Sequence, residues 1–382
     1  MTLLGVHLTV LAGAGVPLPL PEKALDALDT MEVTQSTEGR SAMQAQFKAG
    51  RGSTLAEMAD YPILKHKGLK VGARIVLTLT MGIRPKVLFD GVVTQVQLNP
   101  GQGEGDGTLA VSAEDLAFRM DQHEPTETKE YPALPVAAIA AQVMAPYARY
   151  GLIPMIIPPP TAEIPLPMDR VITQAETDLK FLERLAASVD YVFSIKPGPV
   201  PLTSQGYFGP QPRLGIPQPA LTVNMGPDTN VASIDFQYEA FAAHSVEGEV
   251  QDRTTNETVP VRSTAAVRPP LATSPASANS DVSGTRRLRT DGASSAGQAQ
   301  IEAQAAADAS TDVLSAEGEV DSGKYGRMLE PRQLVGLRGA GSAHDGFWYV
   351  QEVRHMLKMG EYKQHFRLTR EGTGTTTPVV IP

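Results

Sequence analysis

The fold class of this chain is decided by residues 329–372, LEPRQLVGLRGAGSAHDGFWYVQEVRHMLKMGEYKQHFRLTREG. Three segments inside this stretch favour β-strands. Residues 334–337 are short and apolar, whereas residues 346–355 and 362–370 alternate with a period of two and are rich in aromatic and β-branched side chains. Such alternation, interrupted by glycine-containing turns, is typical of an antiparallel meander. We interpret this meander as the closing half of a β-barrel.

The alternation also predicts which side chains share a face of each strand. In the strand over 346–355, one face is expected to carry Phe347, Tyr349, Gln351 and Val353, and the other Trp348, Val350, Glu352 and Arg354. In the strand over 362–370, Tyr362, Gln364, Phe366 and Leu368 are expected to point the same way.

Composition limits what the chain can be. Its 382 residues suggest two or three domains, and 42% hydrophobic with 20% charged residues indicate a globular protein. The net charge of −9 argues against broad binding to nucleic acids or anionic membranes. Cysteine is absent, which excludes disulfides, thiolate metal sites and a cysteine nucleophile. No apolar run approaches the ~20 residues of a membrane-spanning helix, and we interpret the N-terminus as mature protein.

The predicted fold is mainly β (α+β), with two similar β-barrel domains separated by a small α/β insert. Short strands with glycine-rich turns assign the first barrel to 1–120. The insert covers 121–219, where residues 177–189 form the clearest helix and 196–219 a long loop. The second barrel is expected over 220–372, with an extended and helical excursion at 262–314, before a tail at 373–382.

Candidate catalytic patterns are weak. The run Gly101–Gly107 contains two acidic residues and does not fit a phosphate-binding motif, which favours a hairpin loop. Ser342, His344 and Asp345 have the residue types of a catalytic triad, but they stand within four positions, which favours turn chemistry.

Metal-binding patterns are equally weak. His355 and His365 could face each other across one hairpin, but no carboxylate partner stands beside them. Glu247 and Glu249 fit a solvated strand face better than a catalytic acid pair. We therefore predict no enzymatic activity, and no catalytic, cofactor-binding or metal-binding residues.

Four stretches carry a resemblance to a known family. Residues 87–120 contain F-x-G-x-V followed by a loop, a strand and an Asp-containing turn, and residues 177–195 contain D-x-x-F-L-x-x-L-A leading into an aromatic strand. Residues 224–261 and 314–372 supply the start and end of a second barrel. In this order they resemble the hub family of contractile tails: late control protein D, the baseplate hub of contractile phages and the N-terminal half of type VI secretion VgrG proteins. The hub helix–strand motif corresponds to Asp178, Phe181, Leu182, Leu185, Ala186, Tyr191 and Phe193.

The resemblance implies a mechanical role. Hub proteins of this family form homotrimers in which two barrels per chain make a pseudo-sixfold ring between a hexameric inner tube and a trimeric spike. The implied partners are a separate spike protein, the inner tube protein and, further out, baseplate wedge, tape-measure or cargo proteins, with no nucleic-acid specificity and no membrane segment. The implied location is the tail baseplate of a virion or injection-system particle, assembled in the bacterial cytoplasm. Our candidates for the subunit interface are Trp348, Tyr349, Val350, Val353, Ile301 and Val313.

Two other functions stay open at the level of sequence: a tail-tip hydrolase of the cell wall and a carbohydrate- or receptor-binding β protein. The first requires convergent acids or a metal site, and the second an exposed aromatic platform. The sequence also leaves open whether the particle is a phage tail, a bacteriocin or an injection system.

Overall fold

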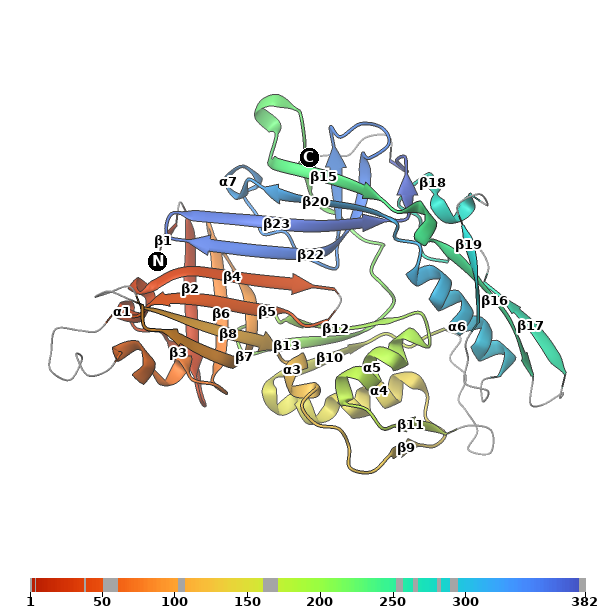
Figure 1. Cartoon of the computed structure of the whole chain (residues 1–382), viewed down its shortest axis with the longest axis horizontal. Helices are drawn as coiled ribbons and strands as arrows, with labels where there is room; N and C mark the ends of the chain where they lie inside the picture. The colour runs from red at the N-terminus through yellow and green to blue at the C-terminus, as the bar shows by residue number, and fades with distance from the viewer. Residues whose placement is uncertain are drawn as a thin grey trace.

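The structure is a computed structural model that describes residues 2–3, 5–37, 39–50, 61–101, 107–160, 171–251, 257–263, 267–279, 283–288 and 295–377. Strands hold 45% of the residues and helices 21%, which confirms the prediction of a mainly-β fold. Figure 1 shows the N-terminal and C-terminal β units side by side, with the insert below them and the excursion at one end.

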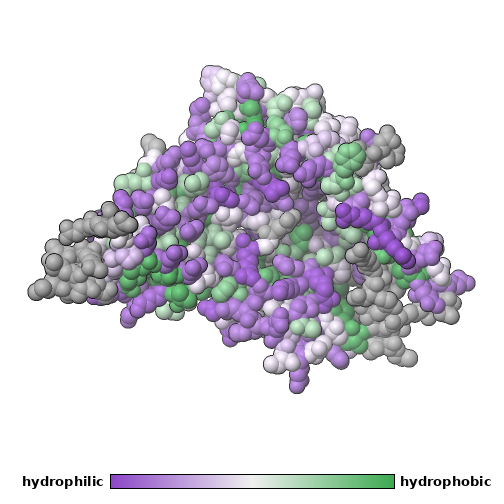
Figure 2. Space-filling view, viewed as in Figure 1, coloured by the Kyte–Doolittle hydropathy of each residue, from purple (hydrophilic) through white to green (hydrophobic). Residues whose placement is uncertain are grey.

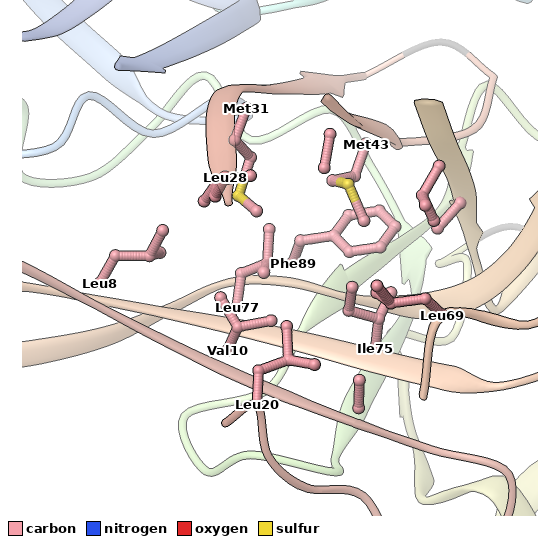
Figure 3. Packing of buried hydrophobic residues seen from close by; sticks show 14 of the residues in the cluster. Leu8, Val10, Leu20, Leu28, Met31, Met43, Leu69, Ile75, Leu77 and Phe89 are labelled. Carbon is pink, nitrogen blue, oxygen red and sulfur yellow. The ribbon is translucent and has the colours of Figure 1, made fainter. Parts of the chain in front are cut away.

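The first β unit is a curled sheet in the order β2-β6-β7-β8-β5-β4. Its strands are β1 (Thr2–Leu3), β2 (Val6–Gly13), β3 (Leu18–Pro19), β4 (Leu28–Ser36), β5 (Ala42–Lys48), β6 (Arg74–Met81), β7 (Arg84–Asn99) and β8 (Thr108–Asp115). Short helices accompany them: α1 (Glu22–Asp26), η1 (Pro62–Lys65), η2 (Lys67–Leu69) and α3 (Ala117–Met120). Alternate apolar residues point into one core, which Figure 3 shows around Phe89.

Steric crowding explains why the F-x-G-x-V motif has a glycine. A Cβ atom at Gly91 would lie 2.2 Å from the main-chain oxygen of Glu114 and against the ring of Phe89. Only glycine therefore lets β7 approach β8 so closely at this bend.

The insert packs two helices against small sheets. Its elements are β9 (Lys129–Tyr131), α4 (Val136–Met144), η3 (Ala145–Tyr150), β10 (Leu152–Ile156), β11 (Ile172–Gln174), α5 (Asp178–Ala187), β12 (Val192–Pro197) and β13 (Ser204–Gly209). The predicted helix is present as α5, with the hydroxyl of Thr177 accepting a hydrogen bond from the Lys180 amide. The predicted loop 196–219 is corrected in part, because β13 lies within it and pairs with both β10 and β12. Glycine and proline around β13 hide this short strand from pattern analysis.

The second β unit has the order β14-β21-β22-β23-β20-β15. Its elements are β14 (Gln218–Thr222), η4 (Gly226–Asp228), β15 (Val231–Tyr238), η5 (Ala240–Ala242), β20 (Leu314–Val320), α7 (Ser322–Tyr325), β21 (Leu334–Arg338), β22 (Gly346–Lys358), β23 (Glu361–Arg370) and β24 (Gly372–Thr373). The predicted antiparallel meander is confirmed as β21-β22-β23, and Gln364, Phe366 and Leu368 are buried together as expected.

The predicted faces of β22 need one correction. The β22–β23 register shifts between Val350 and Glu352, so Gln351 is an extra residue in a β-bulge. The bulge reverses the alternation, and Val353 joins Trp348 and Val350 in the core instead of pointing with Tyr349. Strict period-two counting fails here because one inserted residue exchanges the two faces.

The excursion between β15 and β20 begins at His244, earlier than the predicted residue 262. It comprises β16 (His244–Gln251), β17 (Thr258–Arg262), β18 (Ser274–Pro275), η6 (Ala276–Ala278), β19 (Gly284–Arg287) and α6 (Ala296–Ala309). The strand at 244–251, expected in the second barrel, lies instead in a separate sheet, β17-β16-β19. Alternation reveals that a segment is a strand but not which sheet it joins. Helix α6 packs its alanines against this sheet, around Val246 and Val250.

A buried carboxylate anchors the excursion to the second unit. Glu371 accepts hydrogen bonds from the main-chain amides of Leu271 and Ala272, and it pairs with the buried guanidinium of Arg213 at 3.2 Å. Arg213 also pairs with Asp312. Because Glu371 and Arg213 are buried, each needs its partners to offset the cost of desolvation.

Candidate assembly surface

The two β units share one sheet. Strand β4 pairs antiparallel with β22, from Thr30 opposite Lys358 to Ser36 opposite Glu352, which joins the units into a 14-stranded sheet. In the described part of the chain the ladder passes from β4 to β22 and does not return to β2, so the predicted barrels are two curled units of a continuous sheet. We call the β4–β22 contact the internal seam (Figure 1).

The second unit repeats the first, strand for strand. The order β2-β6-β7-β8-β5-β4 corresponds to β14-β21-β22-β23-β20-β15. Every neighbouring pair from β6 to β4 is antiparallel, as is every pair from β21 to β15. The first strand differs, because β2 is antiparallel to β6 whereas β14 is parallel to β21.

Irregularities of the ladder recur at matching positions. In the two ladders Val93 and Val350 occupy the same position. The β7 bulge at Thr94 therefore corresponds to the β22 bulge at Gln351. Likewise, the irregularity of β4 at Asp29 corresponds to the irregularity of β15 at Ala232. Two bulges at the same places indicate a duplicated unit, because bulges are specific features of a ladder and not a consequence of strand order.

A main-chain hydrogen bond to the residue before each bulge also recurs. The Gly72 amide donates to the carbonyl of Val93 at 2.8 Å, and the Arg332 amide donates to that of Val350 at 2.9 Å. Both residues have a left-handed backbone, with φ of 85° at Gly72 and 64° at Arg332. Glycine adopts this conformation without strain, whereas arginine does not, so Arg332 is held there by its contacts.

Those contacts fasten the internal seam. The Arg332 guanidinium donates to the carbonyl of Ser36 at the end of β4. The amide of Thr37 donates to the carbonyl of Gln351 at 2.9 Å, and Gln35 donates from its side chain to the carbonyl of Leu88 at 2.6 Å. The end of β4 is therefore held by both β units.

The side chains on the core side of the internal seam are buried. Val33 and His355 lie opposite each other with 0% exposure. Burial lowers the pKa of His355 to about 3, so its ring is neutral, and its Nδ1 lies 2.8 Å from the hydroxyl of Tyr362. Protonation of His355 would place a charge in this core, which makes the seam sensitive to acid.

The other side of the shared sheet is polar. Across the internal seam Arg354 pairs with Glu32 at 3.3 Å. Over the second unit Lys363 pairs with Glu319 at 3.3 Å and Arg367 with Glu317 at 3.5 Å, each between neighbouring strands. Over the first unit its exposed side chains are mainly uncharged, including Gln44, Gln46, Gln95 and Gln97. An open hollow of about 720 Å³ lies on the charged part. Figure 2 shows hydrophilic residues over most of the visible surface, with smaller hydrophobic areas between them.

Among the described residues, several strands of the shared sheet have one unpaired edge, and two of these edges correspond to the two sides of the internal seam. Strand β7 pairs with β6 only up to Val92, and beyond Val93 only its β8 side is occupied. Strand β15 pairs with β20 alone. The matching edges inside the chain, on β22 and β4, are occupied by each other.

The residues singled out for catalysis or metal binding can be placed where the structure describes them. His344 and Asp345 donate their amides to the carbonyl of Gly341, and the Asp345 carboxylate accepts from the Ala340 amide, so this segment is a turn, as predicted. His355 and His365 do not face each other, because neighbouring positions of the ladder place them on opposite faces. The described residues contain no group of three or more His, Asp or Glu arranged to hold a metal ion.

The hub helix–strand residues lie in the core of the insert. Phe181, Leu182, Leu185, Ala186 and Phe193 are buried there, and Tyr191 packs against them. Asp178 accepts hydrogen bonds from Tyr147 at 2.8 Å and Gln174 at 2.6 Å, and burial with this carboxylate nearby raises the pKa of Tyr147. Their role is to build the insert.

The predicted interface residues require a correction. Trp348, Val350 and Val353 are 0% exposed in the second core, while Tyr349 and Val313 are 2% and 4% exposed. These five side chains are enclosed by their own chain and leave no surface for another subunit. Ile301, on α6, is half-buried and stays a candidate. The free edges of β7 and β15 were missed, because a sequence pattern does not show which strand of a sheet is left unpaired.

Solved structures share this architecture over nearly the whole chain. A tail protein from Neisseria meningitidis MC58 superposes with a TM-score of 0.63 at 15% identity, covering 96% of this chain and 97% of that one. The 43 kDa tail protein of prophage MuSo2 from Shewanella oneidensis gives 0.65 at 13% identity, covering 96% and 98%. An E. coli type VI secretion component, c3393, described as similar to the T4 tail proteins gp27 and gp5, gives 0.54 at 12% identity, covering 93% and 77%.

This chain has the fold of these tail proteins and of this type VI secretion component. The resemblance drawn from sequence motifs is thereby confirmed at the level of the fold. No protein-family description and no curated protein matches the sequence itself. In the described residues, no helix is long and apolar enough to cross a membrane.

Proposed function

We propose that this protein is the structural hub of a contractile tail or injection system. In this role three copies form a pseudo-sixfold ring between a hexameric inner tube and a trimeric spike. The observation that carries the proposal is the duplicated β unit: each chain presents two units with the same strand order and the same bulges, joined edge to edge. Three such chains present six matching units, so a threefold ring offers a sixfold partner one contact per unit.

The fold likeness supports the same role. The superposed proteins are phage and prophage tail proteins and a type VI secretion component. By this reasoning the partners are the inner tube protein and a separate spike protein, and baseplate wedge, tape-measure or cargo proteins are more distant candidates. The location is the tail baseplate of a virion or injection-system particle, assembled in the bacterial cytoplasm.

The polar face of the shared sheet suits the inside of the ring. Its cross-strand ion pairs and amide side chains are hydrated groups that need no partner, whereas the opposite face encloses the cores. Such a face can line a wet channel without exposing apolar surface. We propose a mechanical rather than a catalytic role, which the likeness to tail proteins and a type VI secretion component supports.

Native mass spectrometry of the purified full chain, alone and with the tube and spike proteins of its particle, tests the proposal. We expect a species of three times the 40.7 kDa chain mass, with bound tube protein in multiples of six. A chain that stays monomeric in both samples would contradict the hub function. Clearing of a cell-wall gel by the pure protein would favour the hydrolase alternative.

A further inference from the structure

We propose that the cavity between the insert, the excursion and the second β unit binds a small oxyanion, a carboxylate or phosphate group, through the guanidinium of Arg332. The cavity has a volume of about 370 Å³ and lies where α5 and α6 approach each other beside the second unit (Figure 1). Besides Arg332, its lining includes Ala187 and Tyr191 of the insert, Ala305 of α6 and Tyr349 of β22. The inference is independent of the proposed function, which involves no ligand.

The guanidinium of Arg332 is incompletely satisfied by its own chain. One terminal nitrogen donates to the carbonyl of Ser36, and Nε is buried without a hydrogen-bond partner among the described residues. The carboxylate of Asp115 attracts this guanidinium but forms no ion pair with it, because its oxygens accept the amides of Ser41 and Ala117. A largely enclosed cation without a counter-ion is costly, so an anion in the cavity would stabilise it.

The charge balance of the lining favours an anion. Four other charged residues line the cavity, and each has a partner of its own: Arg268 with Asp190, Arg367 with Glu317, Asp312 with Arg213, and Glu239 with Gln237. Glu239 is also exposed, so solvent screens its charge. Burial and the positive charge of Arg332 lower the pKa of Lys196 on β12, which places a second cationic group nearby. The unbalanced charge inside the cavity is therefore positive.

Buried hydroxyl groups add neutral donors to the lining. Tyr349 and Thr369 both line the cavity and are 2% and 5% exposed. Burial raises the pKa of Tyr349 to about 12, so its hydroxyl keeps its proton and can donate to an oxyanion. Hydrogen bonds to an ionised acceptor are roughly twice as strong as those between neutral groups. One unpaired guanidinium with hydroxyl donors suits a singly charged oxyanion better than a cation or an apolar ligand.

A bound oxyanion would act on several parts of the chain at once. The lining comes from the insert, the excursion, the second β unit and, through Thr37, the end of β4. This arrangement exists only in the folded chain. A ligand that binds only the folded chain stabilises it by mass action, so we expect the anion to strengthen the packing of these parts against one another.

A titration of the purified full chain with inorganic phosphate, followed by ³¹P nuclear magnetic resonance, tests the inference. A parallel titration uses ¹³C-labelled acetate, and chloride keeps the ionic strength constant. We expect saturation at one anion per chain. Arg332→Gln should weaken binding by about 10- to 100-fold, because it removes a charged donor. Tyr349→Phe should weaken it by about 2- to 10-fold, because it removes one neutral donor.

Two comparisons keep the test decisive. Arg354→Gln removes the same charge from an exposed position on the polar face, outside the cavity, and should leave the affinity unchanged. Equal weakening by Arg354→Gln and Arg332→Gln would reveal a general charge effect and overturn the site. Tyr349→Phe keeps the buried ring, so it tests the site even where Arg332→Gln fails to fold.

The remaining outcomes are distinct. Saturation by both anions supports a site for oxyanions in general, and saturation by one of them narrows it to carboxylates or to phosphates. Absence of saturation by either would show that the cavity holds water alone and would overturn the inference. The same affinity in the natural chain and in both cavity variants would place the anion elsewhere and overturn it as well. None of these results decides the hub function, which native mass spectrometry tests separately.

Discussion

At the scale of single residues, Arg332 and His355 hold the internal seam by different means. Arg332 keeps a left-handed backbone and donates to the carbonyl of Ser36 across the junction. His355 fills the core side as a neutral ring. Their counterparts in the first unit are Gly72 and Leu98, so the corresponding edge of β7 carries neither the guanidinium nor the imidazole.

Arg332→Ala should lower the free energy of unfolding by about 1.5–3 kcal/mol, because a buried carbonyl loses a charged donor. Alanine keeps the left-handed strain, so no relief offsets this loss. Urea unfolding measures it, with the exposed Arg327→Ala as the control, expected within ~0.5 kcal/mol of the natural protein. Equal stability of Arg332→Ala and the natural protein would show that the side chain does not fasten the seam.

His355→Leu should make the protein less sensitive to acid. The folded-state pKa of His355, about 3, is below the unfolded value near 6.5, so the unfolded chain takes up the proton first and stability falls as pH drops below 6.5. From pH 7.5 to pH 4.5 the natural protein should lose about 2–3 kcal/mol more than the leucine variant.

Urea unfolding at the two pH values checks this difference. Comparing variants is necessary because burial raises the pKa of Asp115 and Asp308 to about 6, which works in the opposite direction and is common to both proteins. Parallel pH profiles for the two proteins would contradict the assignment of acid sensitivity to His355.

At the scale of elements, the excursion depends on one carboxylate. Glu371 binds two main-chain amides of the segment 267–279, and Arg213 joins it from the loop before β14. The loss of this carboxylate should therefore affect the excursion before it affects the two β units.

Glu371→Gln should loosen the excursion without unfolding the β units. The amide cannot replace the charge that Arg213 requires, and breaking a buried pair costs about 3–5 kcal/mol. Hydrogen exchange should accelerate at the amides of Leu271 and Ala272 and stay unchanged in β5 and β8. The exposed Glu249→Gln in the same excursion is the control, and equal protection in both variants would refute the anchoring role.

At the scale of the whole molecule, the sequence predicts the type of each element better than the way in which the elements pair and pack. The motifs around Gly91 and Phe181 predict the mainly-β fold and the resemblance to hub proteins, because close packing restricts those positions to few residues. The bulge at Gln351 is invisible to an alternation count, which is why Val353 was assigned to the wrong face. An aromatic strand residue such as Trp348 has the same sequence pattern whether its own chain or another chain encloses it, so the sequence does not separate a core residue from an interface residue.

The joint between the units is the main feature that sequence patterns could not supply. Residues of β4 and β22 stand more than 300 positions apart, and nothing local to Val33 indicates that His355 lies opposite. The duplication is likewise carried by ladder pairing and bulges rather than by repeated residues. It becomes visible only when strands are matched in space.

Cryo-electron microscopy of the assembled ring decides whether duplicated units let three chains act as a sixfold ring. We expect threefold symmetry and six β units around one channel. A ring with another number of chains, or one in which the two units of a chain lie at different distances from the axis, would contradict it.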